Sequence, residues 1–297
     1  MSNWAIQCTN VTKKYVQFSL DVTNFQVQTG SIMGLIGVNG AGKSTLMRIL
    51  MGLIHQDRGA VKVLDHPMPA AQIDAKRDVG YVSEDMRLYA DATLAWHMEF
   101  VGSIYPHWDQ AYANHILQRF DLKATQKMKG MSHGQRVKAA LVLVLARRPR
   151  LLILDEPTTG LDPVARHELL SVLMEVLADE ERTVLFSSHN TLDVEQISDA
   201  ITFIDAGQII DSDDKETYVE RWRRIRLEVA ATTQLPTLEG LVTSQRSGKI
   251  TTITTNRYTP QLASKLHAAG ATILETQPLT LEEIFVATVQ QQRGNHE

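Results

Sequence analysis

A glycine-rich loop at residues 37–44, with the sequence GVNGAGKS, constrains the fold of this chain more than any other segment. It matches the pattern G-x-x-x-x-G-K-[ST] at every position. A short apolar run at residues 31–36 precedes it, and apolar residues at helical spacing follow it, which predicts the order strand, loop, helix. In such a loop the backbone N–H groups and the N-terminus of the next helix face phosphate oxygens. The pattern therefore predicts a nucleotide-binding site.

The residue types in this loop suit a bound triphosphate. Glycines let the backbone approach phosphate oxygens closely. Lys43 can reach the β- and γ-phosphates as a point charge, and the Ser44 hydroxyl can ligate Mg²⁺. The residues predicted to bind the nucleotide in this segment are Gly37, Asn39, Gly40, Ala41, Gly42, Lys43, Ser44 and Thr45.

A second element of the sequence ends in two carboxylates. The apolar run at residues 151–154 predicts a buried strand, and Asp155 and Glu156 come directly after it. A strand of this kind delivers its C-terminal residues to the ligand edge of the sheet. We predict that Asp155 holds Mg²⁺, directly or through water, and that Glu156 polarises an attacking water. Without a metal ion, the two carboxylates would repel a triphosphate.

The composition is that of a globular protein. Of the 297 residues, 43% are hydrophobic and the net charge is −4, which disfavours disorder and a whole-protein attraction to nucleic acid or anionic lipid. A single cysteine, Cys8, excludes an internal disulfide framework and a cysteine-cluster metal site, and it favours the cytoplasm. The longest apolar run, residues 139–146, is far shorter than the roughly 20 residues that a membrane span needs. We expect no membrane span and no nucleic-acid partner.

Apolar strands alternate with amphipathic segments over the first part of the chain, which predicts an α/β fold with a mainly parallel sheet. We place a domain boundary at about residue 215, after a change in composition. Residues 216–297 are expected to form a small α+β domain. The basic run at residues 221–226 (RWRRIR) is expected to lie in an exposed helix between the two domains.

Residues 131–135 (MSHGQ) resemble the LSGGQ signature of the ATP-binding subunits of ABC transporters. The chain is similar to that family over about residues 4–215. The resemblance implies a P-loop NTPase core with a mainly parallel sheet, an antiparallel N-terminal β-subdomain and a helical subdomain at about residues 84–147. Residues 1–215 would then be the ATP-binding domain, followed by the small α+β C-terminal domain.

The signature carries an implication for assembly. The resemblance implies that Ser132 and Gly134 of this chain, with Gln135 beside them, bind the γ-phosphate of an ATP held by a second ATPase subunit. The phosphate would then lie at the N-terminus of the helix that follows the signature. Two ATP molecules would then lie between subunits arranged head to tail.

Three other positions resemble binding residues of the family. Asp162, at the end of residues 159–162 (TGLD), lies in a segment similar to the loop that touches the partner's site. His189 resembles the switch histidine that contacts the γ-phosphate. Tyr15 resembles the aromatic residue that stacks on adenine.

Two positions depart from the family's pattern. His133 replaces the first glycine of the signature, which adds bulk beside the phosphate. Glu84 stands where the family usually has glutamine. A carboxylate can still ligate Mg²⁺ through oxygen, although it cannot donate a hydrogen bond as an amide can. We therefore predict Ser44, Glu84 and Asp155 as the metal ligands.

The resemblance implies an ATP-hydrolysing motor subunit whose catalytic residues are Lys43, Glu156 and His189 and whose cofactors are ATP and Mg²⁺. Its expected partners are a second ATPase subunit, in a homodimer, and an integral membrane permease that holds the chain at the inner face of the cell membrane. The C-terminal domain and residues 281–285 (LEEIF) are similar to those of exporter-type ATPases, so export is the expected direction.

Other functions compete with this one. A soluble ABC ATPase acting on nucleic acid or ribosomes usually has two ATPase domains or a long coiled coil, whereas this chain has one phosphate loop and one signature. The signature and the lack of an Asn-Lys-x-Asp element disfavour a phosphate-loop kinase or GTPase. A binding-only regulatory subunit, in which His133 and Glu84 mark lost activity, is the remaining alternative.

Overall fold

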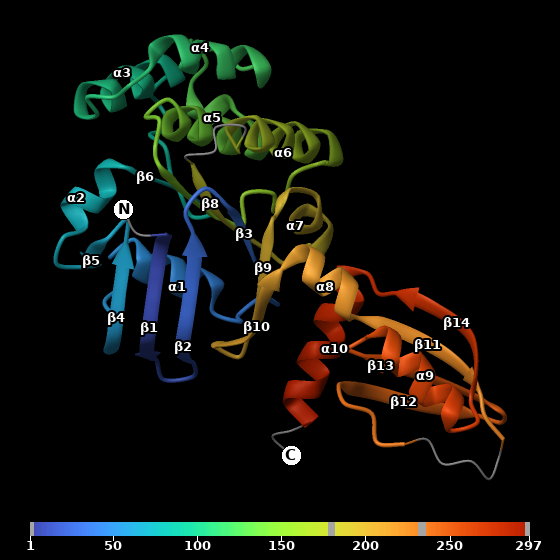
Figure 1. Ribbon diagram of the computed structural model, residues 1–297. Coiled ribbons are helices and arrows are strands. Elements are labelled where there is room, and N and C mark those ends of the chain that lie inside the picture. The colour runs from blue at the N-terminus through green and yellow to red at the C-terminus, as the bar shows by residue number, and fades with distance from the viewer. Residues whose placement is uncertain (1–2, 178–181, 231–235, 295–297) are drawn as a thin grey trace. The chain divides into compact units, whose positions relative to one another are not determined.

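The computed structural model describes residues 3–177, 182–230 and 236–294 (Figure 1). The chain divides into two compact units, residues 1–209 and residues 210–297. Among the described residues, no helix is both long enough and apolar enough to cross a membrane.

Five strands in the order β9-β3-β8-β7-β6 form the centre of the first unit, and β10, which begins in this unit and runs past residue 209, pairs with β9 as the sixth strand of the sheet. The pairs β9–β3, β3–β8, β8–β7 and β7–β6 are parallel. Every residue of β3, β7 and β8 is buried, as expected for strands that are covered on both faces. The strands are β3 (Ile32–Ile36), β6 (Val79–Ser83), β7 (Leu151–Asp155), β8 (Thr183–Ser188), β9 (Ala200–Asp205) and β10 (Gln208–Asp214). The helices next to them in the chain are α1 (Lys43–Leu50), α6 (Pro163–Leu177) and α7 (Thr191–Ile197).

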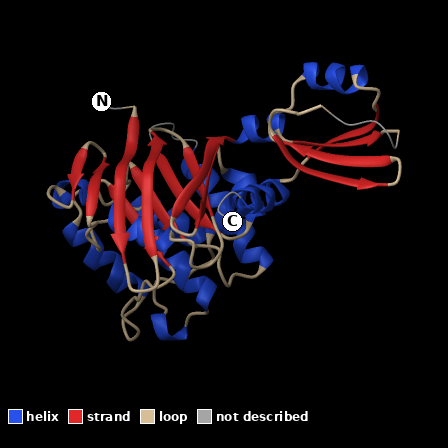
Figure 2. Cartoon of the chain, turned by 90° about the horizontal axis from the view of Figure 1, so that it is seen from below, coloured by secondary structure: helices blue, strands red, loops and turns tan. Residues whose placement is uncertain are grey.

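A second, antiparallel sheet of the first unit has the order β2-β1-β4-β5 (Figures 1 and 2). One hydrophobic cluster joins Cys8 of β1, Leu46 of α1 and Ile153 of β7, so α1 packs between the antiparallel and the parallel sheet. The elements added here are β1 (Trp4–Lys14), β2 (Ser19–Gln28), β4 (Arg58–Val63), β5 (His66–Met68) and α2 (Gln72–Arg77).

A helical segment lies between β6 and β7. Within the expected helical subdomain at about residues 84–147, α3 (Leu94–Ile104) and α4 (Gln110–Arg119) are separate helices, and Pro106 lies in the break between them. A short turn, η1 (Met128–Gly130), leads to α5 (His133–Leu145). Eight consecutive residues of α5, from Lys138 to Leu145, are buried, so this helix is the core of the segment.

The second unit contains a four-stranded sheet with the order β12-β13-β11-β14, in which all three pairs are antiparallel. Ile225 and Leu227 of β11 pack with Ile253 of β13 and with Leu262 and Leu266 of α9. The elements are α8 (Lys215–Arg221), β11 (Arg223–Glu228), β12 (Leu241–Ser247), β13 (Ile250–Thr255), α9 (Pro260–Ala268), β14 (Thr272–Pro278) and α10 (Leu281–Gly294).

The expectation of a helix through residues 221–226 is wrong. Helix α8 ends at Arg221, and residues 223–228 form β11, the strand between β13 and β14. Ile225 and Leu227 are fully buried on alternate positions, which is the period of a strand. Trp222 is also buried, with 1% of its surface exposed, so this segment is not an exposed connection.

Candidate functional site

Five of the predicted site residues are linked by direct contacts at the carboxyl edge of the parallel sheet: Lys43, Ser44, Asp155, Glu156 and His189. Ser83, Asp155 and Ser187 lie in register on β6, β7 and β8, near the ends of these strands. Strand β3 lies on the other side of β8, and the glycine-rich loop follows its last residue, Ile36. Because the strands are parallel, segments far apart in the sequence deliver their side chains to one place.

The loop needs glycine at the positions where the pattern has it. A side chain on Gly37 would meet the Ile204 carbonyl oxygen at 2.5 Å from its Cβ. Gly40 and Gly42 have φ angles of 81° and 111°, in the region that favours glycine. Gly42 is the N-terminal cap of α1, so the first N–H groups of the helix lie at the end of the loop.

The Lys43 ammonium lies within the loop. Its Nζ donates to the carbonyl oxygens of Gly37 (2.7 Å) and Val38 (3.2 Å), and it forms an ion pair with Glu156 Oε1 at 3.0 Å. Only 5% of the Lys43 side chain and 10% of the Glu156 side chain are exposed, so this pair is shielded from solvent.

Asp155 is held by two hydroxyl groups. Ser44 Oγ donates to Asp155 Oδ1 at 3.1 Å, and Ser187 Oγ donates to the same oxygen at 2.9 Å. Burial raises the pKa of the Asp155 carboxyl above its ordinary value, although both hydroxyl donors oppose the shift. A hydroxyl and a buried carboxylate side by side are oxygen ligands of the kind that Mg²⁺ takes together with phosphates. Ser44 and Asp155 therefore fit a magnesium ion.

Glu156 has an unusual backbone, with a φ angle of 52°. Its N–H donates to Ser187 Oγ (2.9 Å), and Oε2 accepts from Thr159 Oγ1 (2.9 Å) and contacts His189 Nδ1 (2.8 Å). Burial acts to raise the pKa of Glu156, but the Lys43 charge and these donors outweigh it and leave the pKa below its ordinary value. The carboxylate is therefore charged, buried and fixed.

The signature residues have a structural role in the chain itself. Ser132 caps α5: its Oγ accepts from the Gln135 N–H at 3.2 Å, while Gln135 Oε1 accepts from the Ser132 N–H at 3.0 Å. This reciprocal pair is a capping box. A Cβ on Gly134 would lie 3.4 Å from Leu161 Cδ2. Asp162 precedes α6, and its Oδ1 accepts from the N–H groups of Val164 and Ala165 at the start of that helix.

Tyr15 lies beside the loop rather than in it. It follows β1 in the turn to β2, and 46% of its surface is exposed. Its ring centroid is 6.3 Å from that of Phe18, and a Cβ on Gly42 would lie 3.0 Å from Phe18 Cζ. In the glycine-rich loop itself, Asn39 is exposed, whereas Ala41 is buried.

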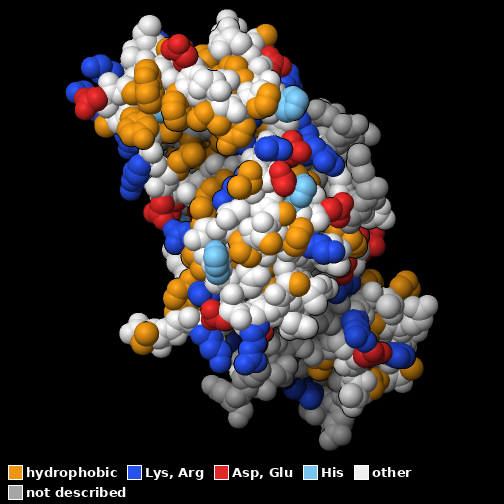
Figure 3. All heavy atoms as spheres, turned by 90° about the vertical axis from the view of Figure 1, so that its left-hand side faces the viewer, with side chains coloured by type: hydrophobic (Ala, Val, Ile, Leu, Met, Phe, Trp, Pro, Cys, Tyr) orange, Lys and Arg blue, Asp and Glu red, His pale blue; other side chains and the backbone are white. Residues whose placement is uncertain are grey.

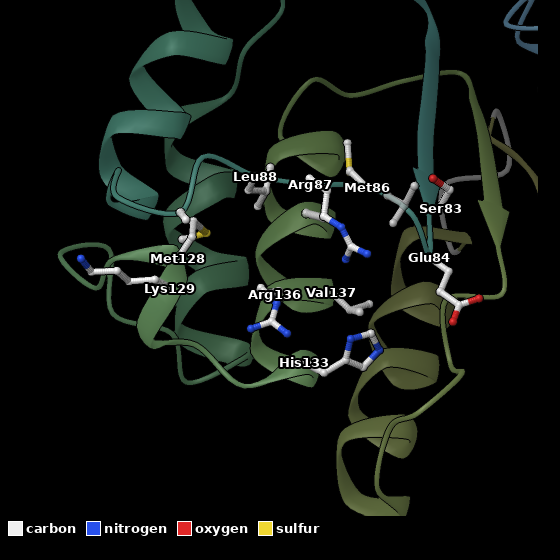
Figure 4. Close-up of a pocket in the computed structure, with 13 residues that line it drawn as sticks. Ser83, Glu84, Met86, Arg87, Leu88, Met128, Lys129, His133, Arg136 and Val137 are labelled. Carbon is white, nitrogen blue, oxygen red and sulfur yellow. The ribbon is translucent and has the colours of Figure 1, made fainter.

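Glu84 is exposed and comes directly after β6, at the same edge of the sheet. Within the part of the chain that the structure describes, it forms no hydrogen bond or ion pair with Ser44 or Asp155. It lines a cavity of about 270 Å³ instead. Figure 4 shows His133 and Arg136 on the opposite wall of this cavity, with Arg87 reaching toward α5.

Two contributors were missed by the sequence analysis. Ser187 links Asp155 to the backbone of Glu156, and the Thr159 hydroxyl donates to the Glu156 carboxylate. The signal for Ser187 was its place at the end of an apolar strand, the same signal that identified Asp155. No local pattern indicated the role of the Thr159 hydroxyl.

Comparison with known proteins supplies the family. A family model described as "ABC transporter" matches residues 20–159. The ATP-binding protein YtrB of Bacillus subtilis is 28% identical over 267 residues, which cover 88% of this chain and 89% of that protein. The Nod factor export ATP-binding protein I of Bradyrhizobium diazoefficiens is 34% identical over 213 residues, 70% of this chain and 69% of that protein.

Solved structures agree with the fold. One described as the ATP-binding subunit of an ABC transporter has a TM-score of 0.65 and 27% identity, and the match covers 73% of this chain and 92% of that one. A nucleotide-free ATP-binding cassette has a TM-score of 0.62 at 21% identity, over 71% of this chain and 91% of that one. The predicted family and fold class are confirmed. This chain belongs to the ABC transporter family and is an ATP-binding ATPase subunit of that family.

Proposed function

We propose that this chain is a motor subunit that hydrolyses ATP with Lys43, Glu156 and His189 to drive export through a separate membrane subunit. The observation that carries the proposal is the buried Glu156 carboxylate, held beside the phosphate loop by contacts with Lys43, Thr159 and His189. Phosphoryl transfer needs positioning and charge neutralisation more than covalent chemistry. The fixed Glu156 carboxylate would position the attacking water, and the Lys43 ammonium would neutralise phosphate charge.

The loop from Gly37 to Thr45 would bind the triphosphate through its N–H groups and the N-terminus of α1. Lys43 would leave Glu156 and turn to the β- and γ-phosphates. Glu156 Oε2 already has two donors, so Oε1 is the oxygen that becomes available to orient and deprotonate water. His189, whose side chain is 46% exposed, would contact the γ-phosphate on closure.

Ser44 and Asp155 would hold the Mg²⁺ ion, with Glu84 as a third oxygen ligand or as the ligand of a bound water. When bound, the ion neutralises charge on the phosphate oxygens. The hydrogen bond from Ser44 to Asp155 supports this role for the first two residues.

A second copy of this chain would complete the site. Ser132, Gly134 and Gln135 at the start of α5, and Asp162 at the start of α6, would face the ATP bound by the partner, and Tyr15 would stack on the adenine. The exposed hydroxyl of Ser132 at the N-terminus of a 13-residue helix supports this assignment, because such an end attracts phosphate. ATP would favour the closed dimer because it contacts both subunits only there.

The membrane partner would dock on the helical segment. Trp96, Phe100 and Ile104 recur every four residues on α3 and are 43%, 47% and 55% exposed. Hydrophobic side chains gather over this part of the molecule in Figure 3. An exposed apolar patch of this kind marks a protein interface. A membrane partner docked there would hold the chain at the inner face of the membrane.

The proposed direction of transport is export. It is favoured by the similarity to a Nod factor export ATP-binding protein at 34% identity.

Substituting Glu156→Gln tests the proposal in the full chain. Removing the carboxylate should lower kcat for ATP hydrolysis by about 100-fold or more, as expected for loss of a general base. ATP binding should persist, and an ATP-bound dimer should accumulate in size-exclusion chromatography. Glu282→Gln, on the exposed start of α10, is the matched control and should hydrolyse ATP normally. Near-normal hydrolysis by Glu156→Gln would refute the assignment.

A further inference from the structure

We propose that His133 is a positioning residue for Glu156, which acts through the turn at residues 156–159 and not by touching the nucleotide. The inference rests on the proposed function in one respect, the role of Glu156 toward the attacking water. The contacts that carry it link α5, the turn after β7 and the carboxylate.

The first link joins His133 to Thr159. His133 is the first residue of α5, and its Nε2 lies 3.0 Å from the Thr159 carbonyl oxygen. A carbonyl oxygen can only accept, so Nε2 must carry the hydrogen. The ring also packs against the next residue: a Cβ on Gly160 would lie 3.3 Å from His133 Cδ2 and 3.4 Å from Nε2. The imidazole therefore fits this turn closely.

The second link joins Thr159 to Glu156. The Thr159 N–H donates to the Glu156 carbonyl oxygen at 3.2 Å, which closes the turn, and the Thr159 hydroxyl donates to Glu156 Oε2 at 2.9 Å. Holding the Thr159 carbonyl thus fixes the residue whose hydroxyl orients the carboxylate. The Glu156 backbone lies in the left-handed region, which is unfavourable for a residue with a side chain, so the turn needs such restraints.

The residue type at position 133 decides whether the first link exists. Glycine has no side-chain donor and would leave the Thr159 carbonyl to solvent. Histidine offers a donor at the end of a short, stiff side chain, and its neutral Nε2–H tautomer and its protonated form both satisfy the bond. The bulk at this position is therefore accommodated by the turn at residues 156–160.

The test separates the donor from the ring. His133→Phe keeps a ring without a donor, and His133→Gln keeps a donor without the ring. Loss of one neutral hydrogen bond corresponds to about 2- to 12-fold in rate, so we expect His133→Phe to lower kcat by that factor while KM for ATP changes less than about twofold. His133→Gln should recover most of the loss. His167→Phe, an exposed position on α6, is the matched control and should leave kcat unchanged.

A double-variant cycle tests the route. Thr159→Val removes the hydroxyl at nearly constant volume, and it should lower kcat on its own. If both residues act through one chain of contacts, the factor by which kcat falls in the double variant should be clearly smaller than the product of the factors in the two single variants. Should His133→Phe not fold, His133→Leu, which also lacks a donor, takes its place in the cycle with Thr159→Val.

Three results would overturn the inference: wild-type kcat in His133→Phe, equal losses in the Phe and Gln variants, or fully multiplicative effects in the double variant. The outcomes are distinct from failure of the proposed function. If Glu156→Gln abolishes turnover but His133→Phe does not lower it, this inference alone fails. If Glu156→Gln turns over normally, the proposed function fails first.

Discussion

Replacing Ser187 with alanine tests how the two carboxylates are held. Ser187 is fully buried at the end of β8, and its hydroxyl makes two contacts: it donates to Asp155 Oδ1 and accepts from the Glu156 N–H, both at 2.9 Å. Alanine removes both contacts with little change in volume. The Asp155 carboxylate keeps its bond from Ser44, whereas the buried Glu156 N–H loses its acceptor.

The magnitude follows from these two losses. A hydrogen bond to a charged group contributes about 1.5–3 kcal/mol, and a buried N–H without a partner costs about 1–3 kcal/mol. Water entering the small space left by the hydroxyl would recover part of the second loss. We expect the free energy of unfolding to fall by about 2–4 kcal/mol. The pKa of Asp155 should also rise further, because one of the donors that hold it down is gone.

Urea unfolding of both Ser187→Ala and Ser198→Ala measures this effect. Ser198 is equally buried, at 1% exposure, but its hydroxyl has no hydrogen-bond partner among the described residues. Ser198→Ala should therefore change the free energy of unfolding by about 0.5 kcal/mol or less, or stabilise the protein slightly. If the two variants unfold within about 0.5 kcal/mol of each other, the contacts of Ser187 do not hold the site as argued.

Two further predictions concern groups outside the site. Burial raises the pKa of the Cys8 thiol to about 12. A thiol reagent at pH 8 should therefore label Cys8 in the native chain only as fast as the chain opens, and urea should accelerate labelling. Complete labelling within seconds in native buffer would contradict this. The pKa of Glu283 is lowered by the Thr280 N–H and by Arg224, so its charge stabilises the fold above the unfolded pKa, and this contribution is lost as pH falls through the folded value. Glu283→Gln should therefore reduce the acid sensitivity of the melting temperature, and an unchanged pH dependence would refute the reasoning.

The phosphate loop and the acidic strand could be predicted because each is written in a few consecutive residues. Glycine, lysine and serine at fixed spacing have few other uses, and an apolar run that ends in carboxylates places them at the edge of the sheet. The contacts of Glu156 were not predictable in this way. Its backbone N–H finds Ser187, 31 residues along the chain, because β7 and β8 lie in register. Only the three-dimensional pairing of strands reveals that contact.

The prediction of a helix through the basic run at residues 221–226 was wrong for a related reason. Arginines at several positions hide the alternation of Ile225 and Leu227, and arginine itself favours a helix. The strand exists because β13 and β14 hydrogen-bond to both of its edges, so tertiary pairing overrides the local preference.

The ion pair between Lys43 and Glu156 links the residue proposed to bind the phosphates with the residue proposed to act as the base. A general base works best when its pKa lies near the working pH, yet the Lys43 charge contributes to lowering the pKa of Glu156. Burial acts in the opposite direction and is the largest single influence on that carboxyl. In the proposed mechanism Lys43 would turn to the phosphates, so its lowering influence on the pKa of Glu156 would weaken while burial remains. We therefore expect the proton affinity of Glu156 to rise when ATP is bound, which is the stage at which the proposed mechanism needs a base.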